Sequence, residues 1–261
     1  DEFMSKFRRS LAKTIGWKNS HLVLCIDEFT YLYTAFERGT LEADFMKTIK
    51  SILEKGYFSA ILVGQDVMPK FKDKFPNEFG VTEDKRLTYL DKNAAKLLIE
   101  QPIRDQETNK SRYIGGAVDG IIEWTASNPY YLQMFCARLV DRMNANKSIN
   151  ITLLDVDEIG KEMVSGNVAL SKDKFDNLLT GGDADVEQFE EEHVIENLKS
   201  IASNTRTHQY CTRDQIKGLK NTTKEEDDSV LEDLIRREVV DLSEYKYYRI
   251  KVKLFQEWLL K

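Results

Sequence analysis

The stretch HLVLCIDEF (residues 21–29) determines how the rest of this sequence is interpreted. Five consecutive apolar residues, 22–26, end at two adjacent acids, Asp27 and Glu28. A short apolar run bounded by polar residues is typical of a strand that is buried on both faces of a parallel sheet. We therefore predict a buried parallel strand with the acidic pair at its carboxyl end.

A second apolar run, FSAILVG (residues 58–64), follows a predicted helix over residues 41–55. Strands that alternate with helices are typical of βαβ units. The expected fold class is therefore α/β, with a partial parallel sheet. LTYL (residues 87–90) is a shorter candidate for a third strand.

The chain becomes helical after Asp91, which we expect to cap the first of several helices. Residues 111–126 and 129–145 predict two more helices, and Asp155 is expected to cap a further helix that ends near residue 164. Residues 166–186 read as a connector, with its most flexible point at GGD (residues 181–183).

The last 75 residues predict helices over 188–203, 212–219 and 225–239, then a hairpin and a closing helical segment. Three helices followed by a β-hairpin are typical of a winged helix. The expected domains are an α/β region, a helical region, a connector and a winged helix, over residues 1–90, 91–165, 166–186 and 187–261.

The composition excludes several classes of protein. Hydrophobic residues make up 41% of the 261 residues and charged residues 31%, which is enough to build a core and excludes a disordered chain. No apolar run approaches the roughly 18 residues of a membrane helix. Residues 1–9 are not followed by the apolar segment of a secretory signal. The formal net charge of −6 gives no general attraction to nucleic acids or anionic membranes.

Three scattered cysteines and three scattered histidines predict neither a disulfide framework nor a zinc site. This cysteine usage favours a reducing, cytoplasmic location.

Asp27 and Glu28 are the strongest candidates for chemistry. In open α/β sheets, ligands bind beyond the carboxyl ends of the strands. One carboxylate can hold Mg²⁺ through its water shell, and the other can orient or deprotonate an attacking water. A solvated strand end before a turn is the alternative interpretation.

Four segments in order resemble one protein family. LVLCIDE (residues 22–28) resembles the Walker B strand of P-loop ATPases of the AAA+ and STAND (signal-transduction ATPases with numerous domains) types. FSAILVGQD (58–66) resembles their sensor-1 strand. SNPYYLQ (127–133) is similar to a helix start in the lid of such ATPases. YRIKVKLFQEWL (248–259) resembles the wing and closing helix of the winged-helix domain that follows the lid.

The resemblance implies that residues 1–90 are a partial P-loop ATPase core and that residues 91–165 are its helical lid. It also implies ATP or ADP and Mg²⁺ as cofactors, and a nucleotide-driven molecular switch as the function. Asp27 would help to hold Mg²⁺, and Glu28 would polarise the attacking water. Either Gln65 or Asp66 would sense the γ-phosphate.

Three softer assignments follow from the same resemblance. Pro129 would pack near the adenine together with Tyr130, although Pro129 also fits a plain first-turn proline capped by Asn128. Arg86 is a candidate γ-phosphate sensor, and its alternative is a solvated basic residue.

The sequence departs from this family at one essential motif. The Gly-x-x-x-x-Gly-Lys-[Ser/Thr] loop, whose backbone N–H groups and lysine cradle the phosphates, does not occur. We therefore expect the C-terminal portion of an ATPase that hydrolyses ATP poorly or not at all on its own. DEF (residues 1–3) reads as a cloning scar, and Met4 fits either a native start or an arbitrary boundary.

Two other functions stay open. One is a non-catalytic interaction module, for which an unpaired sheet edge predicts a protein partner or self-association. The other is a DNA-binding regulator. Residues 187–261 carry 13 Lys and Arg against 16 Asp and Glu, and the third predicted helix begins with EEDD (residues 225–228), which argues against this function. The wing is more basic.

Overall fold

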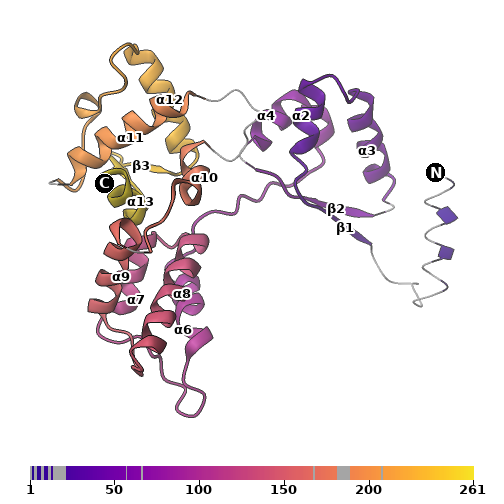
Figure 1. Ribbon diagram of the computed structural model, residues 1–261. Coiled ribbons are helices and arrows are strands. Elements are labelled where there is room, and N and C mark those ends of the chain that lie inside the picture. The colour runs from indigo at the N-terminus through magenta and orange to yellow at the C-terminus, as the bar shows by residue number, and fades with distance from the viewer. Residues whose placement is uncertain are drawn as a thin grey trace. The chain divides into compact units, whose positions relative to one another are not determined.

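The computed structural model describes residues 2, 5, 6, 9, 10, 13, 22–56, 58–65, 67–166, 168–180, 189–206 and 208–261. The predicted connector tip at 181–183 and most of the N-terminal residues lie outside this set. The chain is α/β, mostly helical with a small parallel sheet, and it divides into two compact units (Figure 1). The first ends at Lys85, and the second contains residues 86–180 and 189–261.

The first unit is built around two parallel strands. Strand β1 (Val23–Ile26) pairs with β2 (Ser59–Leu62), with Val23 opposite Ser59 and Ile26 opposite Leu62. The helices between residues 22 and 85 are α2 (Tyr31–Glu37), α3 (Asp44–Glu54), α4 (Met68–Lys74) and α5 (Pro76–Phe79). The βαβ arrangement predicted from residues 21–64 is confirmed, whereas α2, α4 and α5 were not predicted.

An aromatic cluster forms the core of the first unit. Phe71 is fully buried, and its ring centroid lies 5.6 Å from that of Phe29 and 5.1 Å from that of Phe79. Phe36 and Phe75 complete the cluster, with centroids 4.7 Å apart. Ile26 and Leu62 pack against it from the sheet. These contacts hold helices α2, α4 and α5 against one face of the sheet.

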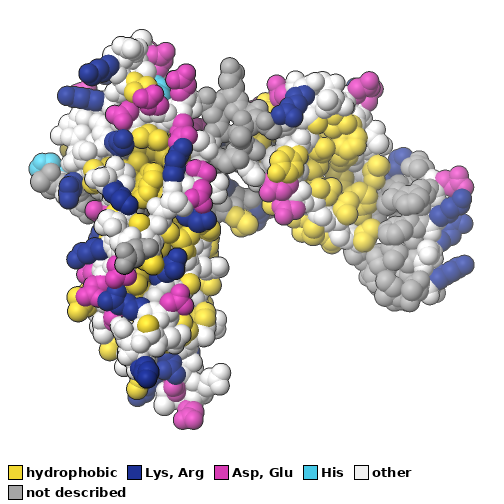
Figure 2. Space-filling model, viewed as in Figure 1, with side chains coloured by type: hydrophobic (Ala, Val, Ile, Leu, Met, Phe, Trp, Pro, Cys, Tyr) yellow, Lys and Arg dark blue, Asp and Glu magenta, His cyan; other side chains and the backbone are white. Residues whose placement is uncertain are grey.

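The prediction that both strands are buried was wrong. Val23 is 49% exposed, Leu24 41% and Ile61 53%, and Val63 after β2 is 46% exposed. Val23, Ile61 and Val63 lie on the sheet face opposite Ile26 and Leu62, and the described helices leave that face in contact with solvent. Leu24 shares the face of Ile26 and is only partly covered there. Figure 2 shows hydrophobic side chains gathered on the surface of this unit.

The predicted third strand over residues 87–90 is also not observed. Leu87 is 95% exposed, and the backbone N–H of Leu90 donates to the carbonyl of Ser127 at 3.0 Å instead of to a strand. The Tyr89 hydroxyl donates to the Glu238 carbonyl at 3.1 Å. Tyr89 and Leu90 are therefore bonded to loops of the second unit and not to a strand.

The second unit begins with four helices and a 3-10 turn. Asp91 caps the first helix by accepting the N–H groups of Asn93 and Ala94, as predicted. Asp155, in contrast to the prediction, is not the N-cap of the helix that ends at Ser165. Thr152 is the N-cap, and Asp155 closes a capping box with it. These elements are α6 (Lys92–Glu100), η1 (Gln101–Ile103), α7 (Ala117–Thr125), α8 (Pro129–Ala145) and α9 (Leu153–Ser165).

The rest of the second unit contains helices followed by a hairpin, as predicted. The predicted helix over residues 212–219 is reduced to one 3-10 turn. The elements are η2 (Lys172–Phe175), α10 (Asp176–Leu179), α11 (Glu191–Thr205), η3 (Arg213–Gln215), α12 (Lys224–Arg236), β3 (Val240–Leu242), β4 (Tyr248–Ile250) and α13 (Lys253–Leu259). Strands β3 and β4 are antiparallel, and Cys211 forms an isolated bridge with Tyr248.

One hydrophobic core runs through the second unit. Helix α13 packs against α7 and α9, so the end of the chain lies on the helices that precede it. Phe175 is fully buried, with its ring 5.2 Å from Phe255 and 4.9 Å from Trp258. The regions predicted as a lid and as a winged helix are therefore parts of one compact body. No helix among the described residues is long and apolar enough to cross a membrane.

Gly160 provides a test of the packing between α7 and α9. A Cβ atom at this position would lie 2.4 Å from Cε2 of the Trp124 ring. Alanine normally favours a helix interior over glycine by about 1 kcal/mol. We expect Gly160→Ala to lower the free energy of unfolding by about 1–3 kcal/mol instead, because the added methyl would overlap the Trp124 ring, which is buried in the core. Urea unfolding followed by tryptophan fluorescence measures this. The exposed neighbour Lys161→Ala is the control, and a Gly160→Ala protein as stable as the unmodified one would contradict the packing.

Candidate functional site

The parallel register brings the predicted acids and the end of the second strand to the same edge of the sheet. β1 ends at Ile26 and β2 at Leu62, and these two residues lie opposite each other. Asp27 and Glu28 therefore leave the sheet beside residues 63–65. Both acids are exposed, as a site that meets a soluble ligand requires.

A bulge at the end of β1 sets the direction of Glu28. The N–H of Val63 donates to the Ile26 carbonyl at 2.9 Å, but the Val63 carbonyl accepts from Phe29 at 2.8 Å instead of from Glu28. One extra residue is thus inserted at the acidic pair. Glu28 has a φ of +52°, in the left-handed region, and its N–H donates to Oδ1 of Asp27 at 2.9 Å. Bulges and left-handed residues of this kind are frequent at functional sites, where they redirect a side chain.

Glu28 makes a direct contact with the second strand's end. Nε2 of Gln65 donates a hydrogen bond to Oε2 of Glu28 at 2.9 Å. Of the two residues that the sequence offered at this position, Gln65 is the one seen to reach the acidic pair. Asp66 lies outside the described residues.

This edge presents oxygen donors suited to Mg²⁺. Mg²⁺ in proteins is usually held by one or two carboxylates, with phosphate oxygens and waters filling the other positions. The carboxylate of Asp27 fits that role. Among the described residues, no group of three or more His, Cys, Asp or Glu side chains could hold a metal alone. A cation here would therefore need oxygen ligands from a bound molecule and from water.

The other predicted site residues belong to the second unit. Asn128 caps α8 by accepting the N–H groups of Tyr130 and Tyr131, and Pro129 occupies the first turn. Tyr130 is 51% exposed. This cap explains Pro129 without a ligand, which leaves its adenine-binding role as a prediction.

Arg86 lies close enough to Glu238 for its charge to act on that carboxylate. A hydrogen bond from Thr88, the ammonium of Lys251 and the charge of Arg86 together outweigh burial and lower the pKa of Glu238. The structure thus places Arg86 near an acid of the second unit. Its role as a phosphate sensor also stays a prediction.

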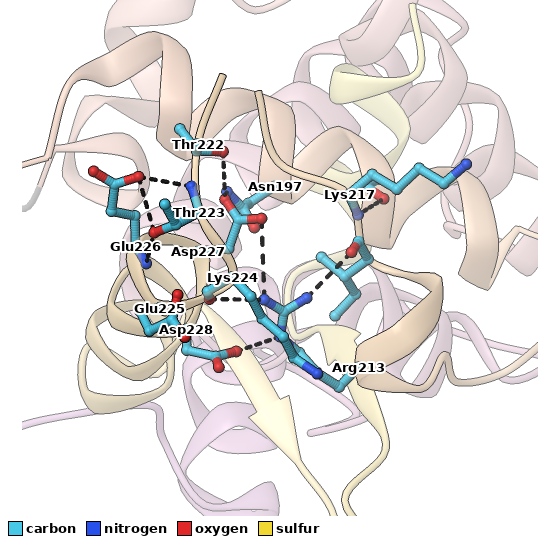
Figure 3. A network of polar contacts seen from close by, with 12 residues as sticks. Asn197, Arg213, Lys217, Thr222, Thr223, Lys224, Glu225, Glu226, Asp227 and Asp228 are labelled. Atoms are coloured by element: carbon cyan, nitrogen blue, oxygen red, sulfur yellow. Dashed lines mark hydrogen bonds and ion pairs between the residues drawn. The ribbon is translucent and has the colours of Figure 1, made fainter. Parts of the chain in front are cut away.

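A buried polar network in the second unit was not predicted (Figure 3). Asp227 of α12 is only 8% exposed, and its Oδ1 lies 2.6 Å from Nε2 of His193. The same carboxylate accepts from Thr222 at 3.0 Å and from Asn197 at 3.4 Å. Gly218 packs so close that a Cβ atom there would lie 1.9 Å from Oδ1. Asp227 therefore joins α11, the loop before α12 and α12 itself.

Most acids of the run 225–228 have partners inside the second unit. Glu226 closes a capping box with Thr223, and Asp228 forms an ion pair with Arg213 (Figure 3). Together with Asp227, three of the four acids thus have partners within the unit. A capping box was predictable from the spacing of Thr223 and Glu226, but the pairing of Asp227 with a histidine 34 residues away was not.

No protein-family model matches the sequence, and no curated protein matches it. Among solved structures, the chain is similar to one described as the ORC2 protein of Aeropyrum pernix in ADPNP–ADP complexes. The two chains are 13% identical, the match covers 98% of this chain and 70% of that one, and the TM-score is 0.43.

Asp227 predicts how stability depends on pH. Burial works to raise the pKa of Asp227, but the hydrogen bonds from His193, Thr222 and Asn197 outweigh it, and the pKa is lowered. The carboxylate therefore stabilises the fold above the unfolded-state pKa of about 3.9, and this contribution is lost as the pH falls through the lower folded-state value.

We expect Asp227→Asn to cost about 1–3 kcal/mol at pH 7. The difference from the unmodified protein should shrink as the pH falls below about 4, because the carboxylate of the unfolded chain takes up its proton there before that of the folded chain does. Urea midpoints between pH 7 and pH 3 measure this, with the exposed Glu225→Gln on the same helix as the control. A difference that stays constant over this range would show that the charge of Asp227 is not involved.

Proposed function

We propose that this chain carries the Walker B-type half of a magnesium–nucleotide site in an ATPase of the AAA+ or STAND kind. In this proposal, Asp27 holds Mg²⁺, Glu28 orients the attacking water, and Gln65 senses the γ-phosphate. The observation that supports it most directly is the hydrogen bond between Gln65 and Glu28. It links the ends of two neighbouring parallel strands at the edge where ligands bind in α/β sheets.

The open face of the sheet supports the same proposal. Parallel sheets are normally covered on both faces and contain more than two strands. Here Val23, Ile61 and Val63 are about half exposed. Further strands at the sheet edges and a phosphate-binding loop, together with a layer packed on this face, would come from outside these 261 residues and complete the nucleotide site.

The second unit would act as the moving part of the switch. Its order of α11, η3, α12, β3, β4 and α13 fits a winged helix whose second helix is a single 3-10 turn. Binding or hydrolysis of nucleotide would then shift the populations of the chain's conformations. The charges of this unit give DNA binding little support, because the guanidinium of Arg213 is already used in an ion pair with Asp228.

A protein-interaction module is the second candidate function. The exposed apolar residues of β1 and β2 favour it, since a bare sheet edge and face pair readily with another chain. Sedimentation of the chain over a range of concentrations tests this function: a concentration-independent monomer would speak against it.

The nucleotide proposal predicts a local response to Mn²⁺·ATP, with Mn²⁺ as a paramagnetic substitute for Mg²⁺. We expect the amide signals of residues 26–29 and 63–65 to broaden selectively in ¹H–¹⁵N spectra, even if binding is weak. Asp27→Asn should abolish this broadening, because it removes the carboxylate that holds the cation. Asp44→Asn, an exposed acid of the same unit, is the control. Broadening that is absent here, or unchanged in Asp27→Asn, would sink the proposal.

Turnover tests the missing phosphate loop separately. We expect no steady ATP hydrolysis by the 261-residue chain, because most phosphate contacts are absent from it. An activity that is present in this chain and lost in Glu28→Gln would contradict the need for a loop from elsewhere. Phosphate release under saturating ATP and Mg²⁺ measures it.

A further inference from the structure

Thr30 follows the acidic pair by two residues, and its surroundings are unusual for a threonine. It occupies the N-cap position of α2, but its side chain makes no capping hydrogen bond. It is 2% exposed, and its hydroxyl has no hydrogen-bond partner among the residues that the structure describes. A buried, unpaired hydroxyl costs stability and calls for an explanation.

The methyl group of Thr30 explains why a threonine is found at this buried position. It faces Gly64, the residue between the end of β2 and Gln65, and a Cβ atom built on Gly64 would lie 2.6 Å from Thr30 Cγ2. The φ of Gly64 is not in the left-handed region, so the backbone itself would accept an alanine. The next contact, with Sδ of Met68 at 3.2 Å, involves the end of a flexible side chain. The constraint at Gly64 is therefore the space occupied by Thr30.

We propose that Thr30 and Gly64 are positioning residues whose close contact holds Gln65 in hydrogen-bonding range of Glu28. Thr30 belongs to the segment that leaves the acidic pair, and Gly64 immediately precedes Gln65. Their contact thus sets how closely the chain after β1 approaches the chain after β2. In this arrangement the shape of Thr30 matters, and its hydroxyl does not.

The side-chain amide of Gln65 reports on this contact directly. Its ¹H–¹⁵N signal, assigned by its loss in Gln65→Ala, should differ between the unmodified chain and Glu28→Ala, which removes the acceptor. We expect Gly64→Ala to move this signal to its position in Glu28→Ala, because the added methyl forces the two segments apart.

Rescue and a shape-conserving variant complete the test. Thr30→Ala in the Gly64→Ala background makes room for the new methyl and should return the signal toward its original position. Thr30→Val keeps the methyl, removes the hydroxyl and should leave the signal unchanged with an equal or higher melting temperature.

Three results would overturn the proposal. These are an unmoved Gln65 signal in Gly64→Ala, a folded double variant without rescue, and a lost signal in Thr30→Val. If Gly64→Ala alone does not fold, recovery of both folding and the Gln65 signal in the double variant supports the proposal, and failure of the folded double variant to recover the signal overturns it.

The consequence for ligand binding rests on the proposed nucleotide site. With Mn²⁺·ATP, Gly64→Ala should weaken the broadening at residues 26–29, and the double variant should restore it. If the Gln65 signal behaves as expected but no variant shows local broadening, the nucleotide function fails and the positioning role stands. If the unmodified chain broadens but Gly64→Ala leaves the Gln65 signal unmoved, the positioning role fails instead.

Discussion

The parallel pairing of β1 with β2 is the constraint on which the candidate site depends. Glu28 and Gln65 are 37 residues apart in sequence, and only the strand register brings them within 2.9 Å. A shift of one residue in that register would turn alternate side chains to the opposite face. The extra residue at the end of β1 then directs the Glu28 carboxylate across to the neighbouring strand.

The sheet itself depends on packing at one face. Two strands alone are marginally stable, so the aromatic cluster around Phe71 has to hold the helices against them. That cluster leaves the opposite face with Val23 and Ile61 exposed. The same feature supports both proposed functions, because an open parallel sheet can be completed by further strands or by a partner chain. Nucleotide-dependent broadening and self-association distinguish these two possibilities.

The acidic residues of the two units differ in their surroundings. At the sheet edge, Asp27 and Glu28 are exposed and available to a ligand. In the second unit, a run of four acids is largely used inside the fold, where Asp227 is buried against His193. A count of charges along the sequence treats both groups alike. Only burial separates the acids that can meet a ligand from those that stabilise the fold.

The strand–helix–strand order, the caps at Asp91 and Asn128 and the final hairpin could be predicted from the sequence. Those features depend on local periodicity and on hydrogen bonds between near neighbours. Tertiary structure alone decided that the strands stay half exposed, that residues 87–90 form no strand, and that Gln65 reaches Glu28. It also placed Thr30 against Gly64 and Asp227 against His193. These outcomes depend on contacts between segments that are far apart in the sequence, and local sequence patterns do not predict such contacts.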